Sequence, residues 1–273
     1  LTLVDDDAEV VSTAATGVSG PTRDDSVAGI GPTVLRVLDI PLLRDSDDGA
    51  GCYVAACGLY DGWRGAELFV SRDSGTTWNS ASLAITSAAV IGSAATVLGN
   101  FLGGNVFDEI NTVEVQVLGG ELSSATEDLV RSGTNTCYLG GEILSFKSAT
   151  LVSTGRYRIS GLRRGRRGTE QYMSTHAIGD PFVLLANAKR LALTSADIGV
   201  PLLLKAVTFG GLLAETDSTP FTPAAAGLEP LSPVNIRAGR SAASAPYDIT
   251  IAWTRRNRLD AACRSYTAVP QSE

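Results

Sequence analysis

Short apolar segments with alternating polar residues, each ended by a turn, constrain the fold of this chain most strongly. In residues 112–118, Val113, Val115 and Val117 alternate with polar residues and so share one side of a strand. The chain has 29 Gly and a single Met among 273 residues, so strong helix formers are few. We therefore expect an all-β protein with minor α content, built from β-sandwich or β-barrel domains. Residues 123–133 are the one expected helix, since Gly133 follows and acidic residues lie near the start.

Turn-rich stretches predict the domain organisation. The first residues lack an initiator Met and a signal pattern, so residues 1–33 are expected to end a preceding β domain of a longer protein. Residues 34–100 and 101–218 are expected to form two β domains. Pro is frequent in residues 219–233, which predicts a linker. Residues 234–273 have the strand spacing and the buried Trp253 expected of a truncated fibronectin-III-like domain.

Charge and hydropathy exclude several functions. No apolar run approaches the ~18 residues that cross a bilayer, so no membrane anchor is expected. The net charge of −7 argues against sequence-specific nucleic-acid binding, because such binding depends largely on neutralising phosphates.

Cysteine and histidine usage excludes a metal centre. The four cysteines form no CxxC pair, so we expect no zinc site and interpret them as reduced, buried residues; they are Cys52, Cys57, Cys137 and Cys263. His176 is the only histidine and lies in a turn-like stretch, which favours a structural or surface role over catalysis. No cofactor-binding loop is found either, so we expect no metal, no cofactor and no catalytic residue.

One motif matches a named structural pattern. Residues 71–78 fit the Asp box, Ser-x-Asp-x-Gly-x-Thr-Trp, through Ser71, Asp73, Gly75, Thr77 and Trp78. Asp73 is expected to cap backbone amides, Gly75 to take a positive φ, and Trp78 to fold back onto the hairpin. In sialidase-type propellers the motif recurs, whereas here it occurs once, so we interpret it as structural.

The strongest charge signal is Leu162-Arg-Arg-Gly-Arg-Arg-Gly-Thr-Glu. Six Arg fall within residues 156–167, which are expected to form a strand followed by an arginine loop. Three interpretations stay open: a phosphate- or nucleic-acid-binding loop, a loop that forms ion pairs with another subunit, and a solvated turn. We favour the second, because the chain is acidic overall and a guanidinium can bind carboxylates through two parallel hydrogen bonds.

Several segments in order resemble a known family. There are five such segments. In chain order they start at Val34-Leu-Arg-Val-Leu-Asp-Ile-Pro, Trp63-Arg-Gly-Ala-Glu, Gly140-Gly-Glu-Ile-Leu, the arginine segment and Ile251-Ala-Trp-Thr-Arg-Arg. Over roughly residues 34–273 the chain resembles the C-terminal part of the baseplate hub, or tail-tip, proteins of long-tailed phages and gene transfer agents. The resemblance implies no enzymatic activity in this part. The most specific segments supply the expected contact residues, Arg163, Arg164, Arg166, Arg167, Glu170, Arg255 and Arg256.

The resemblance also implies partners and a location. Such a hub is a homotrimer that closes the distal end of the tail tube and organises host attachment and DNA ejection. It is assembled in the host cytoplasm, resides in the virion, contacts the host surface, and binds the distal tail protein, the tail tube, the tape measure and often a fibre.

Two other classes of function have weaker signals. The Asp box and the acidic loops would suit a glycan hydrolase, which needs two exposed carboxylates in an open cleft. Tyr60, Trp63 or Trp78 would serve a carbohydrate-binding module as stacking surfaces, provided that they are exposed and coplanar.

Overall fold

The regular structure of the described residues is mainly β, as predicted. The computed structural model describes residues 30–241 and 248–256. Strands hold 43% of these residues and helical elements 10%. The α-helix α1 (Glu127–Arg131) lies within the expected residues 123–133. The other helical elements are 3-10 turns: η2 (Asp45–Asp47), η3 (Glu170–Ser174), η4 (Leu185–Asn187), η5 (Ser195–Asp197), η6 (Leu213–Glu215) and η7 (Ala226–Leu228).

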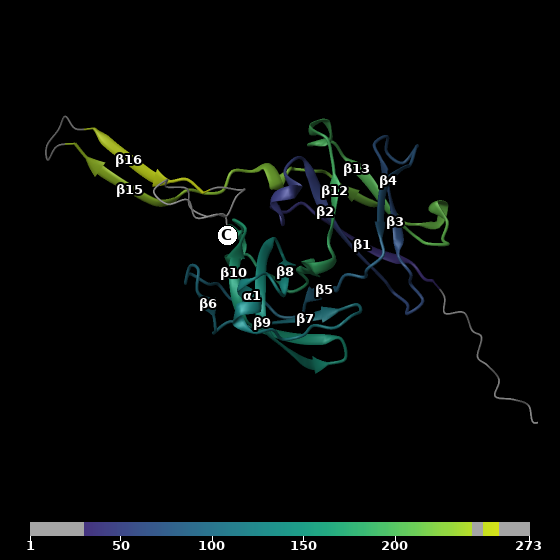
Figure 1. Ribbon diagram of the computed structural model, residues 1–273, viewed down its shortest axis with the longest axis horizontal. Coiled ribbons are helices and arrows are strands. Elements are labelled where there is room, and N and C mark those ends of the chain that lie inside the picture. The colour runs from purple at the N-terminus through teal and green to yellow at the C-terminus, as the bar shows by residue number, and fades with distance from the viewer. Residues whose placement is uncertain (1–29, 242–247, 257–273) are drawn as a thin grey trace, which may run out of the picture.

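A six-stranded barrel forms the middle of the chain (Figure 1). Its strands follow the order β10-β7-β5-β11-β8-β9, and β9 pairs with β10 to close it. A short strand, β6 (Phe107–Asp108), extends the sheet beside β10. Val113, Val115 and Val117 point into the barrel core as their alternation predicted. The barrel strands are β5 (Ile91–Ala94), β7 (Val113–Val117), β8 (Thr136–Leu139), β9 (Glu142–Ser153), β10 (Arg156–Arg166) and β11 (Pro181–Leu184).

Two further sheets pack face to face as a sandwich. One has the order β1-β2-β12 and the other β14-β13-β3-β4, and apolar side chains from both fill the space between them. The strands are β1 (Thr33–Leu38), β2 (Gly51–Gly58), β3 (Ala66–Ser71), β4 (Asn79–Ile85), β12 (Lys189–Ala192), β13 (Leu202–Thr208) and β14 (Thr219–Phe221).

Strand β2 joins the sandwich to the barrel, because both of its faces are buried. Cys52 and Val54 point into the sandwich core, whereas Tyr53 and Cys57 pack in a second core with Ile91 and other residues from the barrel. A strand covered on both faces reads as a continuous apolar run, as residues 52–57 do.

The barrel is an insertion into the sandwich. Residues 33–85 and 189–221 supply the sandwich strands, and residues 91–184 between them supply the barrel. The sheets thus divide the chain differently from the expected boundary near residue 100, because antiparallel pairing brings β12 and β13 back to β2 and β3.

Part of the expected linker is ordered sheet. Thr219–Phe221 forms β14 against β13. Beyond it, the amides of Ala224, Ala225 and Ala226 donate hydrogen bonds to the Asp39 carboxylate over 2.5, 3.1 and 2.9 Å. One acid after β1 therefore fixes the chain as it leaves the sandwich.

A two-stranded arm follows. Strands β15 (Val234–Arg240) and β16 (Ile249–Thr254) pair only with each other among the described strands, and Figure 1 shows them extending away from the other sheets. Trp253, which the sequence predicts to be buried in a fibronectin-III-like core, is 59% exposed on this hairpin. The rest of the expected domain, residues 257–273, lies outside the described part of the chain, as do residues 1–29 and Cys263.

The described cysteines are unpaired and buried, as expected. Burial raises the pKa of the Cys52 thiol to about 12 and that of Cys137 well above its ordinary value. These thiols are therefore protonated at neutral pH and pack as small apolar side chains.

The Asp box forms the turn between β3 and β4 in the predicted way. The Asp73 carboxylate accepts hydrogen bonds from the Thr77 amide (2.9 Å) and hydroxyl (2.6 Å), and from the Ser71 hydroxyl (2.7 Å). Gly75 has a φ of +91°, and Trp78 donates its indole N–H to the Gly75 carbonyl over 3.1 Å. The motif stabilises a hairpin and leaves the carboxylate fully engaged.

Asp73→Ala is expected to lower the melting temperature at neutral pH by removing these bonds. The Thr77 hydrogen bonds, with that of Ser71, lower the pKa of Asp73 to about 2. A lowered pKa stabilises the fold above the unfolded value of ~3.9, and this contribution is lost as the pH falls toward the folded value. The difference from wild type, measured by thermal unfolding, should therefore shrink between about pH 4 and pH 2. Asp61→Ala, in the exposed turn after β2, is the control, and an equal change there would contradict the capping role.

Candidate interaction site

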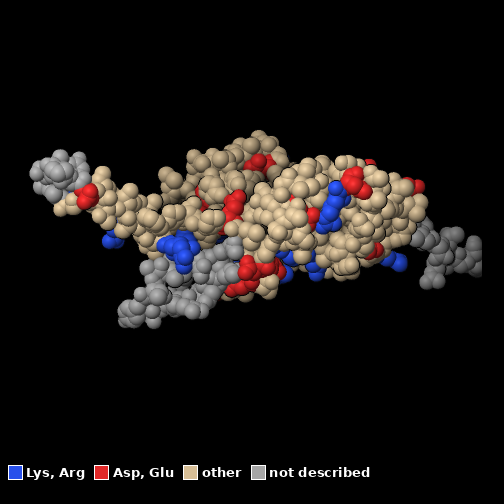
Figure 2. All heavy atoms as spheres, turned by 90° about the horizontal axis from the view of Figure 1, so that it is seen from above, with Lys and Arg blue, Asp and Glu red and all other residues tan. Residues whose placement is uncertain are grey.

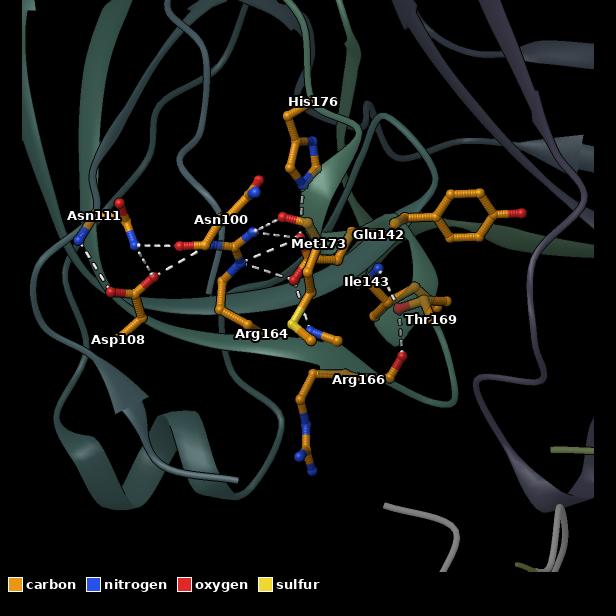
Figure 3. Close-up of polar contacts among 12 residues, drawn as sticks. Asn100, Asp108, Asn111, Glu142, Ile143, Arg164, Arg166, Thr169, Met173 and His176 are labelled. Atoms are coloured by element: carbon orange, nitrogen blue, oxygen red, sulfur yellow. Dashed lines mark hydrogen bonds and ion pairs between the residues drawn. The ribbon is translucent and has the colours of Figure 1, made fainter. Parts of the chain in front are cut away.

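The arginine segment is a strand and not a loop, which corrects the sequence-based expectation. Strand β10 continues through Arg166, and the chain turns only at Arg167, whose φ is +59°. The pairing with β9 shifts register between Arg163 and Arg166, and Gly165 within this bulge has a φ of +57°. The bulge turns Arg164 inward, whereas the side chain of Arg166 points away from the interior in Figure 3.

Arg164 lies at the centre of a buried ion network (Figure 3). Its side chain is 0% exposed, as are those of Glu142 and Asp108. Its Nε and Nη2 donate to Glu142 over 2.9 to 3.1 Å, and its Nη1 donates to Asp108 over 3.2 Å. Nη1 and Nη2 also donate to the backbone carbonyls of Gly99 and Met173.

Glu142 connects this network to His176. The imidazole Nε2 lies 2.7 Å from Glu142 Oε2, and Nδ1 lies 3.2 Å from Asp180 Oδ2. Glu142 Oε1 also accepts the amide of Gly165 over 2.6 Å, which fixes the bulge. Burial alone would raise the pKa of Glu142, but the hydrogen bonds from His176 and Arg164 lower it overall, so this buried carboxylate is ionised at neutral pH.

The expected contact residue Arg164 therefore bonds within its own barrel. No subunit contact reaches it in the folded chain, because the barrel covers it completely. His176 has the structural role expected of it, yet its partner Glu142 was missed. Glu142 follows the turn at Gly140 and Gly141 and lies in an apolar stretch. An acid in such a stretch indicates a buried carboxylate with a charged partner, and this signal could have identified Glu142 from the sequence.

The neighbouring arginines face outward. Arg163 Nη2 lies 3.4 Å and Arg166 Nη1 3.0 Å from the Asn105 side-chain oxygen. Arg167 donates to the carbonyls of Leu42 and Leu43 over 3.1 and 3.0 Å, so it links the barrel to the segment after β1. Arg167, one of the predicted contact arginines, is therefore hydrogen-bonded to carbonyl oxygens of another part of the same chain.

Two of the three remaining expected contact residues meet at the base of the arm. Arg256 Nη1 lies 2.6 Å from Glu170 Oε1, whereas Arg255 is exposed. This ion pair joins the end of β16 to η3 beside the barrel.

The buried acids of the network and the three aromatic candidates do not form an open glycan site. Asp108 and Glu142 both contact one arginine, but their complete burial keeps a substrate from them. Trp63 is half-buried and donates to the Thr33 hydroxyl, and Trp78 is covered by Lys205 at 4.7 Å from its ring. Of the three aromatic candidates only Tyr60 is largely exposed, so they provide no joint stacking surface.

Metal-binding and membrane-spanning features are also missing from the part of the chain that the structure describes. No three His, Cys, Asp or Glu residues there come together in a way that could hold a metal ion. No helix of that part is long and apolar enough to span a bilayer.

Arg164→Met should destabilise the fold by ~3–5 kcal/mol, because it leaves the buried Glu142 carboxylate without its main partner. Arg158→Met is the matched control on the same strand: Arg158 is 54% exposed and bonds Glu114, so its loss should cost less than about 1 kcal/mol. Urea unfolding measures both. The double variant Arg164→Met/Glu142→Gln should be more stable than Arg164→Met alone, because it removes the unpaired buried charge. Equal losses of unfolding free energy for Arg164→Met and Arg158→Met would contradict the importance of the network.

The part of the chain that matches a known protein family is the barrel. A family model described as Rcc01698-like, C-terminal, matches residues 89–183, about a third of the chain. These residues begin just before β5 and end within β11, so the match coincides with the inserted barrel and contains the arginine segment. No curated protein matches the chain. The barrel is thus similar to a family that is associated with gene transfer agents and phage-like proteins.

Proposed function

We propose that this chain is a structural component of the tail tip of a phage or phage-like particle. In this role it is a baseplate hub protein that closes the distal end of the tail tube and organises the proteins of host attachment and DNA ejection. The observation that carries the proposal is the family match over the whole barrel, because it ties one complete structural unit to phage-like proteins.

The arm between residues 234 and 254 supports a role in an assembly. On one face of the hairpin, Ile249, Ile251 and Trp253 alternate along β16, and all three are more than half exposed. Ile236 lies on β15 beside them and is exposed as well. Two-stranded hairpins are only marginally stable alone, and an exposed apolar patch commonly marks a protein contact.

The surface supports a scaffold that binds other proteins. Figure 2 shows a face that is mostly uncharged, with charged side chains in small separate groups. Charged residues make up only 19% of the chain. The proposed partners are further copies in a homotrimer, the distal tail protein, the tail tube, the tape measure and a fibre, with no enzymatic role for this part.

Immunogold electron microscopy of particles that contain an epitope-tagged chain tests the proposal. The label is expected at the distal end of the tail, in particles purified from cells that produce them. Tagged protein that is found only outside the particles, or along the tail tube, would overturn it.

The double variant Ile251→Asp/Trp253→Asp is expected to fold but to be incorporated into particles at less than about a tenth of the wild-type level, because it places charge on the apolar face of the arm. Thr250→Asp/Ala252→Asp changes the opposite face of the same strand and is the matched control. Quantitative immunoblots of purified particles compare the two. Normal incorporation of the first variant would show that the apolar face makes no contact in the assembly.

A further inference from the structure

A cavity lies where the barrel, the segment after β1 and the chain leading to the arm meet, and we call it the junction cavity. Its volume is about 370 Å³, within the range of ~300–1,000 Å³ typical of ligand-binding pockets. Only the tertiary fold brings its walls together, because the lining residues fall in four separate stretches of the chain: 39–42, 138–141, 167–172 and 226–232.

Tyr172 provides an accessible aromatic surface in the junction cavity. Its ring lies so close to Gly141 that a Cβ added there would come within 2.7 Å of it. The residue nevertheless stays 40% exposed, and the half-buried Tyr138 lines the same cavity. An aromatic ring that packs on backbone yet remains accessible is a surface for the apolar C–H face of a ligand ring.

Three exposed polar side chains line the cavity with Tyr172, namely Gln171, Glu229 and Ser232. Within the described part of the chain, no residue hydrogen-bonds any of these three side chains. The amide and the hydroxyl can each donate and accept, and the carboxylate can accept. A ligand that enters the cavity therefore meets available partners for its own hydroxyl groups.

The other two charged residues of the lining are already engaged. The Asp39 carboxylate accepts three backbone amides, and Arg167 donates to two carbonyls. A cation in the cavity would meet the Arg167 guanidinium, and an anion would meet the Glu229 carboxylate. The lining therefore favours a ligand without net charge.

We propose that the junction cavity binds a neutral saccharide. Tyr172 packs against the C–H face of a sugar ring, and Gln171, Glu229 and Ser232 hydrogen-bond its hydroxyl groups. A purely apolar peptide would cover these three polar side chains without pairing them, which costs free energy. The inference goes beyond the proposed function, because binding belongs to the folded chain whether or not the chain is part of a particle.

A glycan array tests the binding. The probes are neutral oligosaccharides of glucose, galactose, mannose, rhamnose and N-acetylglucosamine, and oligogalacturonate is the acidic reference. We expect the full chain to bind at least one of the neutral probes more tightly than oligogalacturonate, which the Glu229 carboxylate repels. The absence of binding to every neutral probe would overturn the proposal, and so would tighter binding of the acidic reference.

Variants of one aromatic residue locate the binding. Tyr172→Ala should weaken binding of the best neutral probe at least about tenfold in isothermal titration calorimetry, whereas Tyr172→Phe keeps the ring and should lose much less. Tyr60→Ala is the matched control, because Tyr60 is 61% exposed and lies outside the cavity lining. An unchanged affinity of Tyr172→Ala, or an equal loss in Tyr60→Ala, would overturn the proposal.

A second pair of variants blocks the cavity without removing Tyr172. Ser232→Trp fills part of the cavity and should abolish binding, whereas Ser218→Trp makes the same change at an exposed position outside the lining and should have little effect. Circular dichroism establishes that each variant is folded. Equal affinities of the two Trp variants would contradict binding in this cavity. Label at the tail tip without saccharide binding would refute this inference alone, and saccharide binding without such label would refute the proposed function alone.

Discussion

The burial of Arg164 between Glu142 and Asp108 is the interaction on which the site depends. A guanidinium enclosed in a barrel is tolerated only when its hydrogen bonds are satisfied, and Arg164 donates to two carboxylates and two carbonyls. The same Glu142 accepts the Gly165 amide and thus holds the bulge in β10. That bulge determines which arginines face outward. The inward arginine is therefore part of the core, whereas its neighbours Arg163 and Arg166 lie beside Asn105 at the edge of the barrel.

Strand β2 holds the barrel against the sandwich. Alternate residues of this strand enter two different cores, so neither unit can separate without exposing apolar surface of the other. Arg167 adds polar links across the same boundary through the Leu42 and Leu43 carbonyls. A cavity of about 590 Å³ lies along this boundary, and residues from both sides line it, among them Arg44 and Arg166. Its shape thus depends on the barrel being fixed against the sandwich.

Prediction from the sequence succeeded where the interactions are local. The Asp box needs only residues 71–78 to make its hydrogen bonds, and the alternation of residues 113–117 directly reflects a strand with one buried side. It failed for the arginine segment, because a run of charged residues with glycines resembles a loop. Only the pairing with β9 shows that Gly165 lies in a bulge of a long strand.

The sequence by itself determined the fold class, the positions of many strands and the chemistry of the Asp box, since these follow from side-chain period and turn residues within a few positions. Tertiary structure alone decided that residues 91–184 form a closed barrel inserted into a sandwich, because that depends on which distant strands pair. It also decided that Arg164 is buried while Arg163 and Arg166 meet Arg44 and Arg131 in one groove. The physical reason is that the position of each arginine side chain depends on the partner that the fold brings to it. For Arg164 these partners are Glu142 and Asp108, which are more than twenty residues away in the chain.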